Sequence, residues 1–89
     1  MREIIKKLSD LRGISGHEYR INEEIAKMFE QYADEVKIDP LGSVIALKKC
    51  GIENAPKVML EAHMDEIGLI VTTITDEGYI TFSNVGGVD

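Results

Sequence analysis

A histidine and an aspartate follow the most apolar run of this chain. Five of the six residues from Val58 to His63 are Val, Met, Leu, Ala or His, and Asp65 comes two residues later. Such a run is too short for a helix and favours a strand with both faces covered. Side chains two apart on a strand share a face, with Cα atoms about 6–7 Å apart. His63 and Asp65 are therefore predicted to meet at the carboxyl end of a buried strand, where ligands of open α/β sheets bind.

This spacing permits two interpretations. In the first, His63 is a metal ligand, and Asp65 accepts the other ring N–H and fixes the tautomer of the imidazole. In the second, both side chains lie in a surface loop and contact only water. One His and one Asp do not fill the shell of a zinc ion, which takes about four ligands. The spacing alone leaves both interpretations open.

Length and composition predict one soluble globular domain at most. The chain has 89 residues, of which 44% are apolar and 29% charged, with no Trp and two Pro. A chain of this size buries only about 60–65% of its unfolded surface. Its stability is therefore expected to be marginal unless something else covers the core.

Charge and cysteine content exclude several partners. The net charge is −6 and no cluster of Lys or Arg occurs, so neither nucleic acid nor a membrane is an expected partner. Cys50 is the single cysteine and cannot form an internal disulfide. No apolar signal segment follows Met1, so the expected location is the cytoplasm.

Two helices are predicted before the first strand. Apolar residues recur at helical spacing between Arg2 and Arg12, and Gly13 is expected to end this helix. Ser15 followed by Glu18 predicts a capping box that opens a second helix, which runs to about Ala33. The predicted core face of the second helix consists of Ile21, Ile25, Met28, Phe29 and Tyr32.

Two hairpins flank the predicted central strand. Residues 35–39 alternate in polarity, and Pro40-Leu41-Gly42 is predicted to turn the chain into a second strand at 43–47, with Asp39 expected to cap that turn. Residues 69–75 and 79–83 form the second pair around the turn at 76–78. The predicted fold is α/β: two amino-terminal helices, an antiparallel hairpin, a central strand of a mixed sheet, and a second β-hairpin.

Four motifs in order carry a resemblance to a known family. In chain order they are Gly13-Ile14-Ser15-Gly16-His17-Glu18, then Asp39-Pro40-Leu41-Gly42, then His63-Met64-Asp65-Glu66-Ile67-Gly68 after Pro56-Lys57-Val58-Met59-Leu60, and last Asp76-Glu77-Gly78 with Val85-Gly86-Gly87-Val88-Asp89. Together they resemble the dinuclear-metal aminopeptidases that include glutamyl aminopeptidase, the archaeal deblocking aminopeptidases and the proteins once called cellulase M. The resemblance extends through essentially the whole chain.

The resemblance implies a function and a domain plan. Residues 1–68 would be the amino-terminal part of an incomplete zinc-peptidase-like catalytic domain, and residues 69–89 would begin a β-rich inserted domain used in oligomer assembly. Two divalent metals, zinc or cobalt first, would activate a water that attacks the first peptide bond of a peptide substrate. His63 transfers as a metal ligand and Asp65 as the catalytic acid that orients the site, whereas the family motif places no ligand at His17.

The resemblance also implies that most of the metal site is missing. The bridging aspartate, the paired glutamates, the remaining aspartate and the last histidine come from sequence that this chain lacks, and neither Glu61 nor Glu66 is placed to replace them. The chain alone is therefore expected to bind metal weakly or not at all and to be inactive. The alternative is a non-catalytic truncated module that self-associates, or pairs with a partner, through exposed strands between Leu69 and Phe82. A carbohydrate-active role lacks a suitable carboxylate pair and a Trp.

Overall fold

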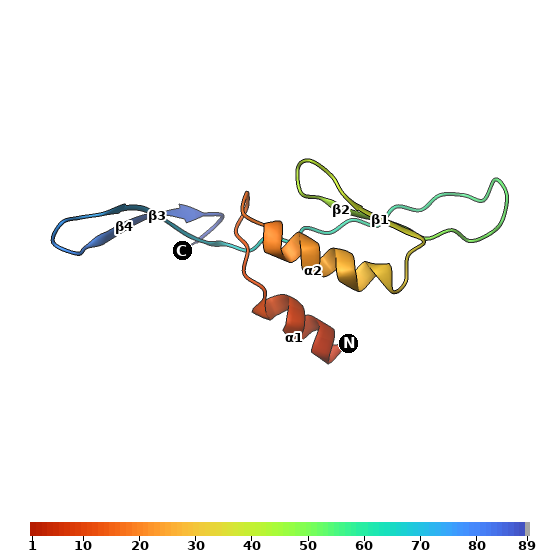
Figure 1. The fold of residues 1–89 in the computed structure, drawn as a ribbon, viewed down its shortest axis with the longest axis horizontal. Coiled ribbons are helices and arrows are strands. Elements are labelled where there is room, and N and C mark those ends of the chain that lie inside the picture. The colour runs from red at the N-terminus through yellow and green to blue at the C-terminus, as the bar shows by residue number, and fades with distance from the viewer. Residues whose placement is uncertain (89) are drawn as a thin grey trace. The chain divides into compact units, whose positions relative to one another are not determined.

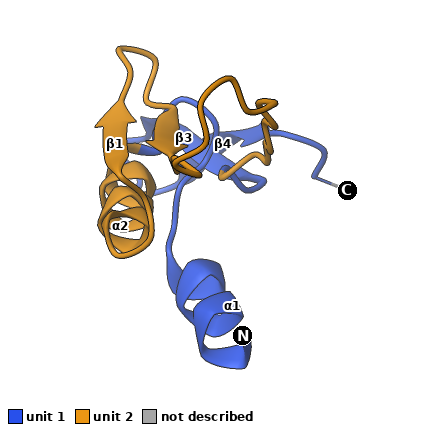
Figure 2. Ribbon diagram, turned by 90° about the vertical axis from the view of Figure 1, so that its right-hand side faces the viewer, with its two compact units in different colours: residues 1–18, 65–89 blue, residues 19–64 orange. Residues whose placement is uncertain are grey.

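The computed structural model describes residues 1–88, and these form two compact units (Figure 2). Residues 1–18 and the stretch from Asp65 onward make one unit, and residues 19–64 make the other. The elements, labelled in Figure 1, are α1 (Arg2–Asp10), α2 (Tyr19–Glu30), β1 (Glu35–Ile38), β2 (Val44–Leu47), β3 (Gly68–Ile74) and β4 (Ile80–Val85). Two helices and two antiparallel hairpins confirm the predicted α/β class. The domain boundary expected after residue 68 stays a prediction.

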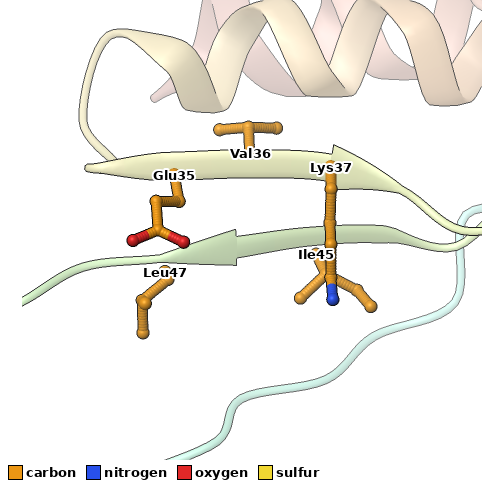
Figure 3. Close-up of a pocket in the computed structure, with 5 residues that line it drawn as sticks. All are labelled: Glu35, Val36, Lys37, Ile45 and Leu47. Carbon is orange, nitrogen blue, oxygen red and sulfur yellow. The ribbon is translucent and has the colours of Figure 1, made fainter.

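In the unit of residues 19–64, α2 packs against one face of the β1–β2 hairpin. Ile21 and Ala26 on α2 are the buried apolar residues, and Asn22 beside them is also buried. Figure 3 shows Val36 of β1 pointing toward the helix. The side-chain nitrogen Nδ2 of Asn22 donates to the carbonyl oxygen of Gly42 at 3.3 Å. A buried polar group is thus satisfied by the turn it supports, which ties the helix to the hairpin.

The β1–β2 turn has the structure that its sequence predicts. Oδ1 of Asp39 accepts hydrogen bonds from the backbone N–H groups of Leu41 and Ser43, each at 2.9 Å. Gly42 has φ 93°, a conformation that side chains with a Cβ rarely adopt. The predicted capping role of Asp39 is confirmed.

The other end of the same hairpin is closed by a carboxylate. The backbone N–H of Lys49 donates to Oδ2 of Asp34 at 2.6 Å, and the N–H of Asp34 donates to the carbonyl of Leu47 at 2.8 Å. The hydrogen bond from Lys49 lowers the pKa of Asp34, and the charges of Lys48 and Lys49 act in the same direction. These contacts fix the point at which β2 ends.

Both helices differ at their ends from the prediction. Helix α1 stops at Asp10, because Leu11 is already extended (φ −76°, ψ 135°), so Gly13 does not end it. The capping box is wrong: Ser15 lies in a turn closed by the N–H of His17 and the carbonyl of Ile14 at 2.9 Å. The carboxylate of Glu18 instead accepts from the N–H of Gly16 at 2.7 Å. Residues 14–17 therefore form a tight turn, where the pattern predicted the start of the second helix.

The predicted core face of α2 is only partly correct. Ile21 is buried and Ile25 and Met28 are half-buried, but Phe29 and Tyr32 are exposed. The helix ends at Glu30, and the N–H groups of Tyr32 and Ala33 both donate to the carbonyl of Phe29 at 2.9 Å. The apolar stripe therefore continues beyond the surface that the short hairpin can cover.

The second hairpin, β3–β4, is confirmed as an antiparallel pair. The N–H of Gly78 donates to the carbonyl of Thr75 at 3.0 Å and closes the predicted turn. A register shift between Val71 and Thr73 marks a bulge, beside which the hydroxyls of Thr72 and Thr81 lie 3.0 Å apart. The bulge was not predicted, since alternation of side chains gives no sign of it.

The prediction of a central strand ending at His63 is wrong. Residues 55–65 are assigned neither helix nor strand, and Val58, Met59 and Leu60 are 84%, 82% and 91% exposed. A strand exists only where a neighbour completes its ladder of hydrogen bonds, and the described residues offer this stretch no such neighbour.

Within residues 1–88, no helix is long and apolar enough to cross a membrane.

Candidate functional site

The backbone just after the predicted metal-site residues is held by the segment that follows α1. Ile14 and Glu66 form an isolated parallel β-bridge, and the N–H of Glu66 donates to the carbonyl of Gly13 at 2.9 Å. Gly13 is buried at this contact. Two motifs far apart in the sequence are therefore joined in one unit.

Two glycines allow close packing on either side of this bridge. A Cβ added at Gly68 would lie 2.4 Å from Cγ2 of Ile14, and one added at Gly86 would lie 2.8 Å from Cγ2 of Ile67. Real Cβ atoms do not approach so closely, so any larger residue would displace its neighbour. The backbone from Glu66 to Gly68 is thus packed against Ile14 and Gly86.

The two candidate site residues lie on either side of a unit boundary. His63 is exposed near the end of the unit of residues 19–64, whereas Asp65 is half-buried and opens the last stretch of the other unit. Asp65 directly precedes the Glu66 bridge, so the backbone that carries its carboxylate is anchored on one side. The predicted convergence of the imidazole and the carboxylate stays a prediction.

The donor set does not complete a metal shell by itself. Within the described residues 1–88, no three His, Cys, Asp or Glu side chains are grouped so as to hold a metal ion. Glu61 and Glu66 are exposed, and His17 lies exposed in the turn before α2. An imidazole and a carboxylate are suitable metal donors, but two are fewer than the coordination of a divalent transition metal needs.

The sequence showed the motifs of this site but not the contact between them. The glycines at positions 13, 68 and 86 were visible as parts of separate motifs. The pairing of residue 14 with residue 66 accounts for the glycine at 68, which lies against Ile14, whereas Gly86 lies against Ile67. Gly68, directly before the strand predicted at residues 69–75, was the available signal of close backbone approach.

Comparison with known proteins identifies the family. Residues 42–89 match the family described as M42 glutamyl aminopeptidase. The chain is also 46% identical over 87 residues to lysyl aminopeptidase from Pyrococcus furiosus, an alignment that covers 97% of this chain and 24% of that protein. The chain therefore belongs to the M42 glutamyl aminopeptidase family.

Solved structures share the fold. An endoglucanase from Thermotoga maritima has a TM-score of 0.85 and 40% identity, and the match covers 94% of this chain and 27% of that one. The PhTET1-12s dodecamer has a TM-score of 0.83 and 44% identity, with 100% and 26% covered. The chain thus spans about a quarter of the length of the relatives that it matches.

Proposed function

We propose that this chain forms the amino-terminal part of a metal-dependent aminopeptidase that removes amino-terminal residues from peptides. Membership of the M42 family carries this proposal. Residues 1–68 would belong to the catalytic domain, and the chain from Leu69 onward would begin an inserted domain. The other three quarters of the protein would supply the metal ligands that the described residues lack.

In this proposal His63 is one ligand of a pair of divalent metal ions, with zinc or cobalt as the first candidates. Asp65 accepts a hydrogen bond from the second ring nitrogen and so fixes the tautomer of the imidazole. The anchored backbone at Glu66 supports this role, because a carboxylate that orients a ligand must itself be held. The other ligands would come from polypeptide that this chain does not contain.

The isolated chain is expected to bind zinc or cobalt weakly and to leave aminoacyl chromogenic substrates intact, because two donors cannot hold a metal ion tightly. Calorimetric titration measures metal binding, and release of the chromogenic group measures hydrolysis of the substrate. His63→Ala is the test variant, and His17→Ala replaces the other exposed histidine as a matched control. A Kd below about 1 μM that is lost only in His63→Ala would contradict the expected incompetence of the isolated chain.

We also propose that the β3–β4 hairpin takes part in self-association. Several of its apolar side chains are exposed, namely Leu69, Ile70, Val71, Ile74, Ile80 and Phe82, and one similar protein is a dodecamer. Ile70→Lys is expected to reduce association in sedimentation experiments, because a charge would be buried in the contact. Gln31→Lys adds the same charge at an exposed position outside the hairpin and should leave association unchanged. Equal association of all three proteins would count against this role.

A further inference from the structure

The bridge between Ile14 and Glu66 divides the side chains around it between two faces. Paired residues of parallel strands share a face, and neighbours along each strand alternate. Ile14, Glu66 and Gly68 are therefore on one face, and the close approach of Ile14 to Gly68 agrees with this assignment. The other face carries Asp65 and, opposite it in the same register, Gly13.

Two glycines flank the face that carries Asp65. Gly13 lies beside Asp65 across the bridge, at the spacing of adjacent strands, which is about 4.8 Å. Gly86 lies beside Ile67, the next residue on this face, and an added Cβ there would lie 2.8 Å from Cγ2 of Ile67. Glycine has no side chain, so a residue with a Cβ at position 13 would occupy space next to the Asp65 carboxylate.

Gly13 also holds the backbone that follows Asp65. Its carbonyl oxygen accepts the hydrogen bond from the N–H of Glu66 at 2.9 Å, and Gly13 is buried while Asp65 is half-buried. A carboxylate that orients a metal ligand must have a fixed backbone and must be able to adopt one particular rotamer. Gly13 meets both needs, because its carbonyl anchors the backbone and its Cα carries no side chain.

We propose that Gly13 is a positioning residue of the metal site and acts through Asp65. Its carbonyl fixes the backbone next to Asp65, and its lack of a side chain lets the carboxylate take the orientation that a partner of the ligand His63 needs. Gly13, Asp65 and the bridge between their neighbours all belong to one unit. This inference rests on the proposed function for the roles of Asp65 and His63.

The test measures zinc binding by the metal-free native gene product at its natural length, in competition with a chelator of known affinity. Gly13→Ala should weaken zinc binding about 10-fold, the lower end of the loss typical of an outer-shell partner of a metal ligand. Gly87→Ala adds the same methyl group in the same unit, with no atom within 4 Å, and should leave the zinc affinity unchanged. Equal zinc affinity of Gly13→Ala and the unaltered protein would overturn the proposal.

A double-mutant cycle distinguishes positioning from a general loss of structure. In an Asp65→Ala background, the side chain that the methyl group at position 13 would displace is already absent. Gly13→Ala should therefore weaken zinc binding much less in this background than in the natural sequence. If the two effects on the zinc affinity are fully additive, Gly13 does not act through Asp65 and the proposal is wrong.

Ile14→Ala makes the same test if Gly13→Ala does not fold. It shortens the side chain that lies against Gly68 on the opposite face, and so loosens the bridge without adding atoms beside Asp65. We expect weaker zinc binding than in the unaltered protein, and no further weakening when Ile14→Ala is combined with Asp65→Ala. A loss of equal size in both backgrounds would refute the role of this contact in positioning Asp65.

His63→Ala in the same titration distinguishes this inference from the proposed function. Weaker zinc binding in His63→Ala and in Gly13→Ala, with a non-additive cycle, supports both. If His63→Ala weakens zinc binding but Gly13→Ala does not, the proposed function stands and the positioning role is overturned. If His63→Ala leaves the zinc affinity unchanged, His63 is not a ligand, and the proposed metal site is overturned together with the inference.

Discussion

Replacing Gly68 with alanine is expected to lower the free energy of unfolding of the unit that contains it by about 1–3 kcal/mol, the usual cost of overpacking. The added Cβ would lie 2.4 Å from Cγ2 of Ile14, which is fixed to its own Cβ and cannot swing aside as the end of a long side chain would. Chemical denaturation followed by circular dichroism measures the loss. Amide exchange at Glu66 should accelerate, since its hydrogen bond to Gly13 belongs to the same contact.

Two controls make this prediction specific to the contact. Gly87→Ala adds a Cβ with no atom within 4 Å and should have little effect. In an Ile14→Ala background the Cγ2 atom is absent, so Gly68→Ala should be less destabilising than in the natural sequence. A double-mutant cycle gives the coupling between the two positions. A coupling of zero would mean that the backbone after Asp65 is not held by Ile14.

Gly42→Ala is expected to destabilise the unit of residues 19–64 by about 1–2 kcal/mol, the typical cost of a left-handed backbone for a residue with a Cβ. Gly42 has φ 93°, and an added Cβ would lie 3.3 Å from Nδ2 of Asn22. Two effects therefore combine, backbone strain and crowding of the buried amide that ties α2 to the turn. Thermal or denaturant unfolding of the variant gives the magnitude.

Gly51→Ala is the matched control for this second prediction. Gly51 has φ 77°, but nothing lies within 4 Å of its added Cβ, so only the backbone strain remains. The excess loss at Gly42 reports the contact with Asn22. If the two substitutions cost the same, the Asn22 contact contributes nothing measurable to the tie between α2 and the hairpin.

Features that depend on neighbouring residues could be predicted from the sequence. Asp39 caps its turn through hydrogen bonds to N–H groups two and four residues later, so the necessary atoms are all local. The turn at 76–78 was visible for the same reason. Both hairpins, and with them most of the fold class, follow from contacts between residues that are close in the sequence.

Features that depend on distant partners could not be predicted. The bridge between Ile14 and Glu66 joins two motifs that no local pattern relates. The strand expected at residues 58–63 needs neighbours on both sides, which the described residues do not provide, so its apolar side chains are exposed. For the candidate site, the pattern named His63 and Asp65 but could not find the contacts that hold the backbone after them.

In the proposed function this polypeptide supplies His63 to the metal site of an aminopeptidase. Peptide hydrolysis by the native gene product, purified from the source cells at its natural length and followed by mass spectrometry of the peptide, tests this role. We expect metal-dependent removal of amino-terminal residues, retained in His17→Ala. His63→Ala removes a direct metal ligand, so its effect should be at least as large as that of losing an outer-shell partner. The rate of hydrolysis should therefore fall by at least about 100-fold, the upper end of the loss typical of such outer-shell changes. Hydrolysis at the natural rate in His63→Ala, or no hydrolysis by the unaltered protein with divalent metal present, would contradict this role.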